Sequence, residues 1–413
     1  MAIMERVTAT VTLLNDTSFT LAENDILSAS ISKQCVSGTG FEFGATCSAT
    51  LNMEFTSNIT NRYQLIGAVI KLSIYKGGAW TGFGVYNVTS ASRWRNNFSI
   101  SASDNMIWLD KSIYSTDENS HKINEIASRL TTATTIYRTL QIVVEEVGGL
   151  QLAQTEAEIS AMSGGNLSTI VFQDITTDCP RDWVYWIAQL LCGFAIADDS
   201  GKIAIKQFET SPSATLTPNI VQAETTDVAD FTLALVGARM EVWDTTMGAV
   251  WYPDLESMPN SVYLDVTDNW IIQGKHYLYG NAMDILDNMA TAISTIPYRP
   301  FSATIHSSEL YHLGQCIQVQ NTDGNYYNSV VTNYDWSLLG GQVLKCSGED
   351  TRLLADTKRR SQVQRLDERL STKIKGLSVN VNGKEELETL ASQGKLIPGT
   401  VYYDISESEE EVR

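Results

Sequence analysis

One stretch, residues 70–88, decides the fold class of this chain. It contains the runs IKLSIY (70–75), KGG (76–78) and TGFGVYNV (81–88). Every second residue of the first run is apolar, and the last run is rich in aromatic and β-branched residues, which is typical of strands. The glycine pair between them favours a tight turn, because glycine readily adopts the positive φ angles of hairpin turns. The sequence therefore predicts a β-hairpin here, within a larger sheet.

Similar runs surround this hairpin. Residues 7–13 (VTATVTL) and residues 48–55 (SATLNMEF) alternate between apolar and polar side chains. Several short strands at such spacing are typical of a barrel or a sandwich. We therefore expect residues 1–115 to form a first β-barrel domain.

The pattern changes after this first domain. Apolar residues at helical spacing predict helices in residues 123–130, 135–147 and 183–194. The third helix leads into a strand, turn and strand over residues 193–208. Helices and a hairpin in close succession predict a mixed α/β domain over residues 116–218.

Strand-like runs return in the second half of the chain, for example in residues 238–243 and 316–320. One helix, over about residues 275–295, interrupts them, and we expect a second β-barrel domain over residues 219–350. The predicted fold class is therefore α+β and mainly β, with two β-barrel domains flanking the mixed domain. A C-terminal helical extension over residues 351–413 completes this architecture.

The start of this extension differs in charge from the rest of the chain. Residues 351–375 contain eight basic and three acidic side chains, and residues 406–413 form an acidic end. Five apolar residues spaced three or four apart would form one stripe on a helix, which is a candidate trimer or partner interface, with a solvated helix as the alternative. The stripe consists of Val363, Leu366, Leu370, Ile374 and Leu377.

The overall charge excludes a general grip on nucleic acid. The chain carries 48 acidic and 29 basic side chains, a net charge of −19. Binding to a phosphate backbone requires the opposite sign. An acidic wall could instead let a polyanion such as DNA slide past without holding it.

Neither export nor a membrane anchor is expected from the sequence. The first residues, MAIMER, lack the basic start and apolar stretch of a secretory signal. The longest uncharged apolar run, residues 183–197, is shorter than the roughly 20 residues that span a bilayer. We expect buried free thiols rather than disulfides at the six widely spaced cysteines, which are Cys35, Cys47, Cys179, Cys192, Cys316 and Cys346.

No motif assembles a catalytic, cofactor or metal site. The neighbouring carboxylates Glu145 and Glu146 do not face each other on regular structure, so they do not resemble the opposed pair of a glycosidase. Residues 198–201 (DDSG) are better explained by a hairpin turn than by a calcium loop, since the chain continues into a strand. The glycine-containing residues 37–40 (SGTG) precede a strand-like run rather than a helix, which favours a loop over a phosphate cradle.

Two further patterns have ordinary structural explanations. His306 and His312 lack a recognisable metal-ligand spacing. The tryptophans are scattered, so core packing explains them better than a carbohydrate-binding platform does. They are Trp80, Trp94, Trp108, Trp183, Trp186, Trp243, Trp251, Trp270 and Trp336.

Four phrases of the sequence, in the same order, resemble phage baseplate hub and tail-associated proteins. The first phrase, in which DILSASI is followed by GFEFGATCSATL, resembles the N-terminal barrel of that family. The closing residues 394–404 (GKLIPGTVYYD) resemble a short phrase of phage appendage proteins, which indicates a docking strand. The four phrases occupy residues 25–51, 80–88, 100–111 and 182–203, and the resemblance covers roughly residues 1–350.

The resemblance implies a non-enzymatic structural protein without cofactors, located in the virion tail and assembled in the host cytoplasm. In this family three chains with two barrels each form a ring that joins the six-fold tail tube to a three-fold spike or fibre. The implied partners are two further copies of the chain, a tube or distal tail protein, a tape measure protein, and a spike or fibre protein. DNA would pass through the ring without specific binding.

Two alternatives belong to other functional classes. A carbohydrate-binding receptor protein of the tail tip would require clustered exposed aromatic residues. A tail-associated cell-wall hydrolase would require opposed carboxylates or a Cys/His pair, which the sequence does not offer. We therefore expect any cell-wall cleavage to belong to a partner.

Overall fold

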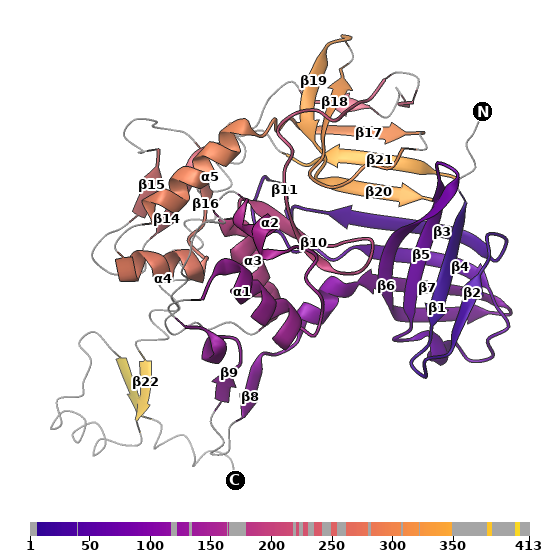
Figure 1. The fold of residues 1–413 in the computed structure, drawn as a ribbon, viewed down its shortest axis with the longest axis horizontal. Coiled ribbons are helices and arrows are strands. Elements are labelled where there is room, and N and C mark those ends of the chain that lie inside the picture. The colour runs from indigo at the N-terminus through magenta and orange to yellow at the C-terminus, as the bar shows by residue number, and fades with distance from the viewer. Residues whose placement is uncertain are drawn as a thin grey trace. The chain divides into compact units, whose positions relative to one another are not determined.

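The chain divides into two compact units in a computed structural model, Met1–Glu349 and Asp350–Arg413. Figure 1 shows the fold as a ribbon. The structure describes residues 6–38, 40–116, 122–131, 134–162, 164, 179–217, 220–222, 226–229, 235–241, 249–253, 262–279, 282–306, 309–321, 323–348, 378–381 and 401–404.

The hairpin predicted from the glycine pair is confirmed. Strand β5 (Val69–Lys76) pairs antiparallel with β6 (Ala79–Trp94), and Lys76 lies opposite Ala79. Gly77 and Gly78 form the turn with φ angles of 59° and 89°. A two-residue turn with both φ angles positive matches the right-handed twist of the strands, so glycine is required there.

The hairpin belongs to an eleven-stranded sheet in the order β13-β17-β21-β20-β3-β4-β7-β6-β5-β1-β2. Ile26–Gln34 (β3) is its centre, because it pairs with β4 on one side and with β20, about 300 residues later, on the other. The other strands are β1 (Val7–Thr12), β2 (Ser18–Leu21), β4 (Thr50–Thr56), β7 (Asn97–Asp104), β13 (Asp227–Val228), β17 (Phe301–Ile305), β20 (Asn333–Ser337) and β21 (Gly341–Cys346).

The expectation of two closed β-barrels is not confirmed. Within the described residues, the sheet order has two ends, β13 and β2, and no sheet closes on itself. The nine-residue β3 explains the difference, because it offers a second edge on which the strands from the second half of the chain continue the sheet. Figure 1 shows β20, β21 and β17 beside β3. The coarser prediction, a mainly β fold with a few helices, is confirmed.

The mixed region packs around one amphipathic helix, α3 (Pro180–Leu190), as its apolar spacing predicts. It leads into the predicted hairpin of β10 (Gly193–Ala197) and β11 (Ile203–Gln207). Before it lie α1 (Ile136–Leu140), which continues into the π-helical segment η4 (Gln141–Val147), and α2 (Glu156–Ser160). The helix of residues 135–147 is thus confirmed.

The helix predicted over residues 123–130 is wrong. The chain forms strand β9 (Lys122–Asn124), paired with β8 (Tyr114–Thr116), and then the 3-10 turn η3 (Ala127–Arg129). Asn124 explains the change, because its Oδ1 accepts hydrogen bonds from the backbone N–H groups of Ile126 and Ala127. Such local side-chain bonds compete with helix formation. Two further 3-10 segments are η1 (Arg62–Leu65) and η2 (Asn105–Asp110).

The single helix predicted over residues 275–295 is two helices, α4 (Trp270–Tyr279) and α5 (Met283–Thr295). The sequence between them, Gly280-Asn281, favours a break because glycine is a poor helix former. Helix α5 ends before Pro297, as expected. The neighbouring strands are β14 (Leu235–Glu241), β15 (Ala249–Tyr252) and β16 (Val262–Asp265) in one sheet, and β12 (Ala214–Thr215), β18 (Cys316–Gln320) and β19 (Tyr326–Val330) in another.

The unit Asp350–Arg413 is described over two strands, β22 (Ser378–Val381) and β23 (Val401–Asp404), which pair in parallel. The predicted helix of residues 351–375 lies outside the described residues. Among the residues that the structure describes, no helix has both the length and the apolar character needed to span a membrane.

Candidate functional site

The five residues predicted to form a trimer or partner interface cannot be placed. Val363, Leu366, Leu370, Ile374 and Leu377 all lie outside the described residues. Their role stays a prediction, and the described part of the chain offers three other polar or exposed features.

The first feature is a pocket of about 370 Å³ beside the turn of the β10–β11 hairpin. Lys33 of β3, Asp199 of the turn and Phe83 of β6 contribute to its lining. Lys33 Nζ lies 3.3 Å from Asp199 Oδ1, and it also lies 5.7 Å from the centre of the Phe83 ring. The pocket therefore brings together the main sheet and the mixed region.

Asp104 is the carboxylate most strongly affected by this environment. It is 4 % exposed, and its two oxygens accept hydrogen bonds from the backbone N–H groups of Ala49 and Met106, at 2.8 and 3.1 Å. Burial raises the pKa of Asp104 to about 6, because desolvation outweighs these two hydrogen bonds and the nearby positive charges of Lys33 and Arg181. Asp104 can therefore exchange a proton near neutral pH.

The bonds of Asp104 also explain why the sequence places a carboxylate here. Asp104 is the N-cap of η2, which follows β7, and the bond to Ala49 ties β7 to the start of β4. A carboxylate provides two acceptors at one position, one for the first turn of η2 and one for the start of β4. The geometry is therefore that of a structural link that holds a titratable group at a pocket.

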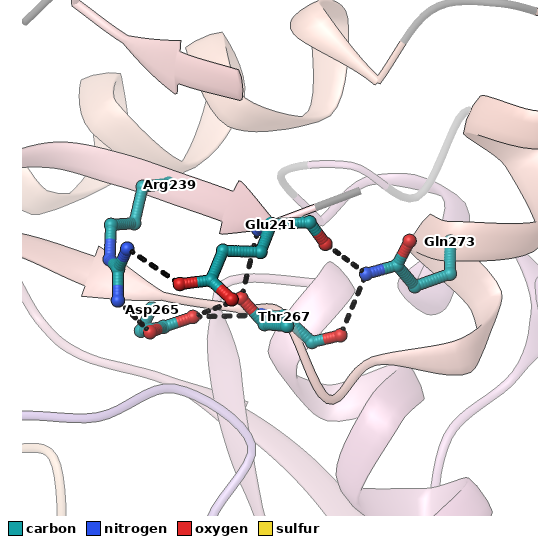
Figure 2. Close-up of polar contacts among 5 residues, drawn as sticks. All are labelled: Arg239, Glu241, Asp265, Thr267 and Gln273. Atoms are coloured by element: carbon teal, nitrogen blue, oxygen red, sulfur yellow. Dashed lines mark hydrogen bonds and ion pairs between the residues drawn. The ribbon is translucent and has the colours of Figure 1, made fainter. Parts of the chain in front are cut away.

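The second feature is a polar network between β14, β16 and α4 (Figure 2). The Arg239 guanidinium lies 2.5 Å from an Asp265 oxygen and 3.3 Å from a Glu241 oxygen. The Arg239 side chain is only 10 % exposed. Asp265 Oδ1 also accepts hydrogen bonds from the backbone N–H and the hydroxyl of Thr267, at 3.0 and 2.5 Å. The arginine is thus fixed between two carboxylates.

This network also fixes helix α4. The side-chain amide of Gln273 donates to the backbone oxygens of Glu241 and Thr267, at 2.7 and 2.9 Å, as Figure 2 shows. Nearby, Asn269 Oδ1 accepts from the first backbone N–H groups of α4, and its Nδ2 donates to the backbone oxygen of Trp186 in α3. The polar groups of this region are thus engaged in holding α3, α4 and the β14–β16 pair together.

The third feature is exposed and lies where the β6–β7 turn meets the loop before β5. Arg93 donates to the backbone oxygen of Thr60, and the Ser57 N–H donates to the Asn96 oxygen at 3.0 Å. Trp94 is 68 % exposed and Tyr63 is 62 % exposed. We call this the arginine–aromatic surface, and it consists of Arg62, Tyr63, Arg93, Trp94 and Arg95.

The guanidinium groups of this surface lie over aromatic rings. Arg95 is 4.6 Å from the centre of the Trp94 ring and Arg62 is 4.9 Å from that of Tyr63, while Arg93 lies 5.3 Å from the buried ring of Phe98. No described carboxylate forms an ion pair with any of the three arginines. Their charge is thus available to a partner.

The tryptophan prediction is therefore right in part. Trp183, Trp186 and Trp336 are buried, as expected of core residues. Trp80, Trp94 and Trp108 are between 42 and 68 % exposed, so the expectation of core packing is wrong for these three. The side chains of Trp243 and Trp251 lie outside the described part of the structure.

The sequence contains a signal for the arginine–aromatic surface that our motif search missed. Residues 55–103 include no aspartate or glutamate, but they include five basic residues. Forty-nine residues without an acidic side chain are unusual in a chain with 48 of them. Such a gap predicts a basic surface wherever these residues fold together.

Several of the simpler predictions are confirmed. Asp198 Oδ1 accepts hydrogen bonds from the N–H groups of Ser200 and Lys202, both at 2.9 Å, so residues 198–201 form a hairpin turn. All six cysteines are free thiols, but only four of them are buried as expected, since Cys47 and Cys179 are partly exposed. Residues 41–43, however, do not form the strand expected after the glycine-containing loop. Among the described residues, no group of three or more His, Cys, Asp or Glu side chains is arranged to hold a metal ion.

Two solved structures share this fold. A tail protein from Neisseria meningitidis superimposes with a TM-score of 0.53 over 84 % of this chain and 97 % of that chain, at 12 % sequence identity. The 43 kDa tail protein of prophage MuSo2 from Shewanella oneidensis gives a TM-score of 0.50 over 83 % of this chain and 95 % of that chain, at 13 % identity.

The comparisons by sequence give no match. No family model matches the chain, and no curated protein is significantly similar to it in sequence. The chain nevertheless has the fold of these tail proteins, which confirms the resemblance seen in its sequence phrases.

Proposed function

We propose that this protein is a structural component of the tail of a phage or of a related injection particle, and that it acts there as a trimeric baseplate hub or tail-tip protein. The observation that carries the proposal is the shared fold, which spans nearly the whole length of two tail proteins and more than four fifths of this chain. Four sequence phrases between residues 25 and 203, which resemble hub proteins, support the same proposal.

The proposed role is mechanical. Three copies would form a ring that joins the tail tube, or a distal tail protein, to a spike or fibre, with the tape measure protein ending above it. The net charge of −19 supports a conduit through which DNA passes without being held, because an acidic wall repels phosphates. This role requires neither a cofactor nor catalysis.

The engaged state of the acidic side chains supports a non-enzymatic role. Glu146 pairs with Arg129 and Arg138, and Glu145 accepts a hydrogen bond from the Leu152 N–H at 3.2 Å. A hydrolytic carboxylate must instead face its substrate and a second carboxylate. These two residues are therefore occupied by structural contacts.

The exposed tryptophans do not favour a carbohydrate receptor. A sugar ring stacks on the face of an aromatic side chain, but Arg95 lies over the face of Trp94. Arg6 likewise lies 4.6 Å from the centre of the Tyr75 ring and 5.6 Å from that of Trp80. One face of Trp94 and one face of Trp80 are thus occupied by an arginine side chain rather than open to a sugar ring.

Electron microscopy of particles labelled with an antibody against this chain tests the proposed location. We expect label at the end of the tail, at the junction of tube and spike or fibre. Label along the tube or on the capsid would contradict the proposal. Separately, light scattering of the purified 45.6 kDa chain should give three times that mass.

A further inference from the structure

The arginine–aromatic surface lies at one end of an unusually basic part of the fold. Residues 55–103 carry five basic and no acidic side chains, and the remaining residues carry 24 basic and 48 acidic ones, a net charge of −24. The acid-free segment forms η1, β5, β6 and all of β7 except its last residue, and the three strands are neighbours in the sheet. The fold thus concentrates positive charge on one part of a strongly acidic molecule.

The arginines of this part differ from most of the other described arginines; the exception is Arg299, which lies over the Tyr327 ring and donates to the backbone oxygen of Ala229. Arg6, Arg129, Arg138, Arg181 and Arg239 each form an ion pair with a carboxylate. Arg62, Arg93 and Arg95 instead contact aromatic rings and backbone oxygens. Arg93 is held by two backbone oxygens, whereas Arg62 and Arg95 present exposed guanidinium groups. A carboxylate that reached these groups would displace no internal ion pair.

Exposed apolar side chains accompany this charge. Besides Trp94 and Tyr63, the side chains of Leu14 and Ile66 are 77 and 38 % exposed. Leu14 lies against Gly67, next to Ile66 in the chain. Tryptophan, tyrosine and arginine are the residues most enriched at the energetic centres of protein interfaces. Their combination here therefore indicates a protein-binding surface with a preference for an acidic partner.

We infer that the arginine–aromatic surface binds the acidic surface of a second copy of this chain. The charge of the chain itself provides the argument, because the residues outside 55–103 together carry a net charge of −24. A contact around a two-fold axis that passed through this surface would place basic surface against basic surface and would be repulsive. A head-to-tail contact instead places basic against acidic surface, and such contacts form a ring where the rotation between copies closes, as in a trimer.

This inference deepens the proposed function, since it names the surface through which the copies of a trimeric hub meet. It also reconciles a basic surface with an acidic conduit. If the arginines are covered by the neighbouring copy, the surface left open to passing DNA remains acidic.

The test compares two charge reversals in the full-length chain. Arg95→Glu changes an exposed arginine of the surface, and Lys206→Glu makes the same change at an exposed lysine of β11, outside the acid-free segment. Sedimentation equilibrium at about 0.1 M salt should show at least a tenfold weaker association for Arg95→Glu and unchanged association for Lys206→Glu. Circular dichroism should show equal folding of both variants.

Arg62→Glu is the second variant of the surface, and we expect it to weaken association in the same way. Raising the salt concentration to about 1 M should dissociate the wild-type chain, since screening shortens the range of charge interactions to about 3 Å. Association of both variants equal to that of the wild type would overturn the inference, and so would a wild-type chain that is monomeric at micromolar concentration.

Two further results would also overturn the inference. One is a charge reversal in the arginine–aromatic surface that abolishes binding to a different tail protein but leaves self-association unchanged. The other is binding of a single-stranded oligonucleotide with no effect of Arg95→Glu on the mass. Neither result touches the proposed location at the end of the tail, which the antibody label tests separately.

Discussion

Two regions of this protein use tryptophan and arginine in opposite ways. In helix α3, Trp183 is fully buried and packs edge-on against Trp186 with ring centres 5.5 Å apart, and the nearby Arg239 is enclosed by carboxylates. At the β6–β7 turn, Trp94 and Arg95 stack on each other in contact with solvent. This difference indicates that the first region stabilises the fold, whereas the second is a surface available to bind a partner.

The largest expected effect is on the buried tryptophan. Trp183→Ala removes a fully buried ring and leaves a cavity, so we expect the free energy of unfolding to fall by about 4 kcal/mol. Urea denaturation followed by circular dichroism measures this. Trp183→Phe is the control, and it should lose clearly less. A loss below about 1 kcal/mol for Trp183→Ala would contradict the description of α3 as the helix around which the mixed region packs.

The buried arginine should come next. Arg239→Ala leaves the Asp265 carboxylate without its partner in a largely buried site, so we expect a loss of about 3 kcal/mol in the free energy of unfolding. Asp265→Asn removes the other charge and keeps an oxygen for Thr267. The double variant Arg239→Ala with Asp265→Asn should lose less than the sum of the two single variants, since Glu241, which is a third exposed, is then the only carboxylate without its partner. Additive losses in this cycle would contradict the coupling.

The features of this fold differ in how well the sequence predicts them. The β5–β6 hairpin could be predicted because alternation and a glycine pair are local signals, and α3 because its apolar spacing follows one helix face. The pairing of β3 with β20 could not, since it joins residues about 300 positions apart and leaves no trace in local periodicity. This pairing continues the sheet of the first half of the chain into strands β20, β21, β17 and β13 of the second half.

The candidate sites divide along the same line. The pocket around Asp104 and the network of Arg239 depend on residues from distant segments, so they could not be predicted from the sequence. The exposure of Trp94 was not predictable either, because a tryptophan in a strand run gives no sign of the face on which it lies. The acid-free residues 55–103, by contrast, are visible in composition alone.

The buried carboxylate should give a smaller effect that depends on pH. The folded-state pKa of Asp104, about 6, lies above the usual value of 3.8, so folding favours the protonated form. The protonated Asp104 side chain therefore adds to the free energy of unfolding. This contribution is fully present below pH 4 and is lost as the pH rises through 6. The unfolding free energy of the wild type minus that of Asp104→Asn should therefore fall by about 3 kcal/mol from pH 4 to pH 7.5.

This pH profile separates the burial of Asp104 from its hydrogen bonds. Loss of one backbone bond in Asp104→Asn gives an offset between the two proteins that is constant with pH, because the amide does not titrate. Only desolvation of the charged form makes the difference change between pH 4 and pH 7.5. A difference that rises with pH would mean that the bonds to Ala49 and Met106 outweigh the burial.

The smallest effect on stability is expected at the exposed tryptophan, and it completes the comparison. Trp94→Ala removes a ring that is 68 % exposed, so the free energy of unfolding should change by less than about 0.5 kcal/mol, measured by the same urea denaturation. Self-association should nevertheless weaken about tenfold, because exposed aromatic residues beside arginines contribute most where a partner covers them. A residue that is dispensable for folding and required for assembly is the opposite of Trp183. If Trp94→Ala instead destabilised the chain as strongly as Trp183→Ala, the β6–β7 turn would be part of the core and not a surface for a second copy.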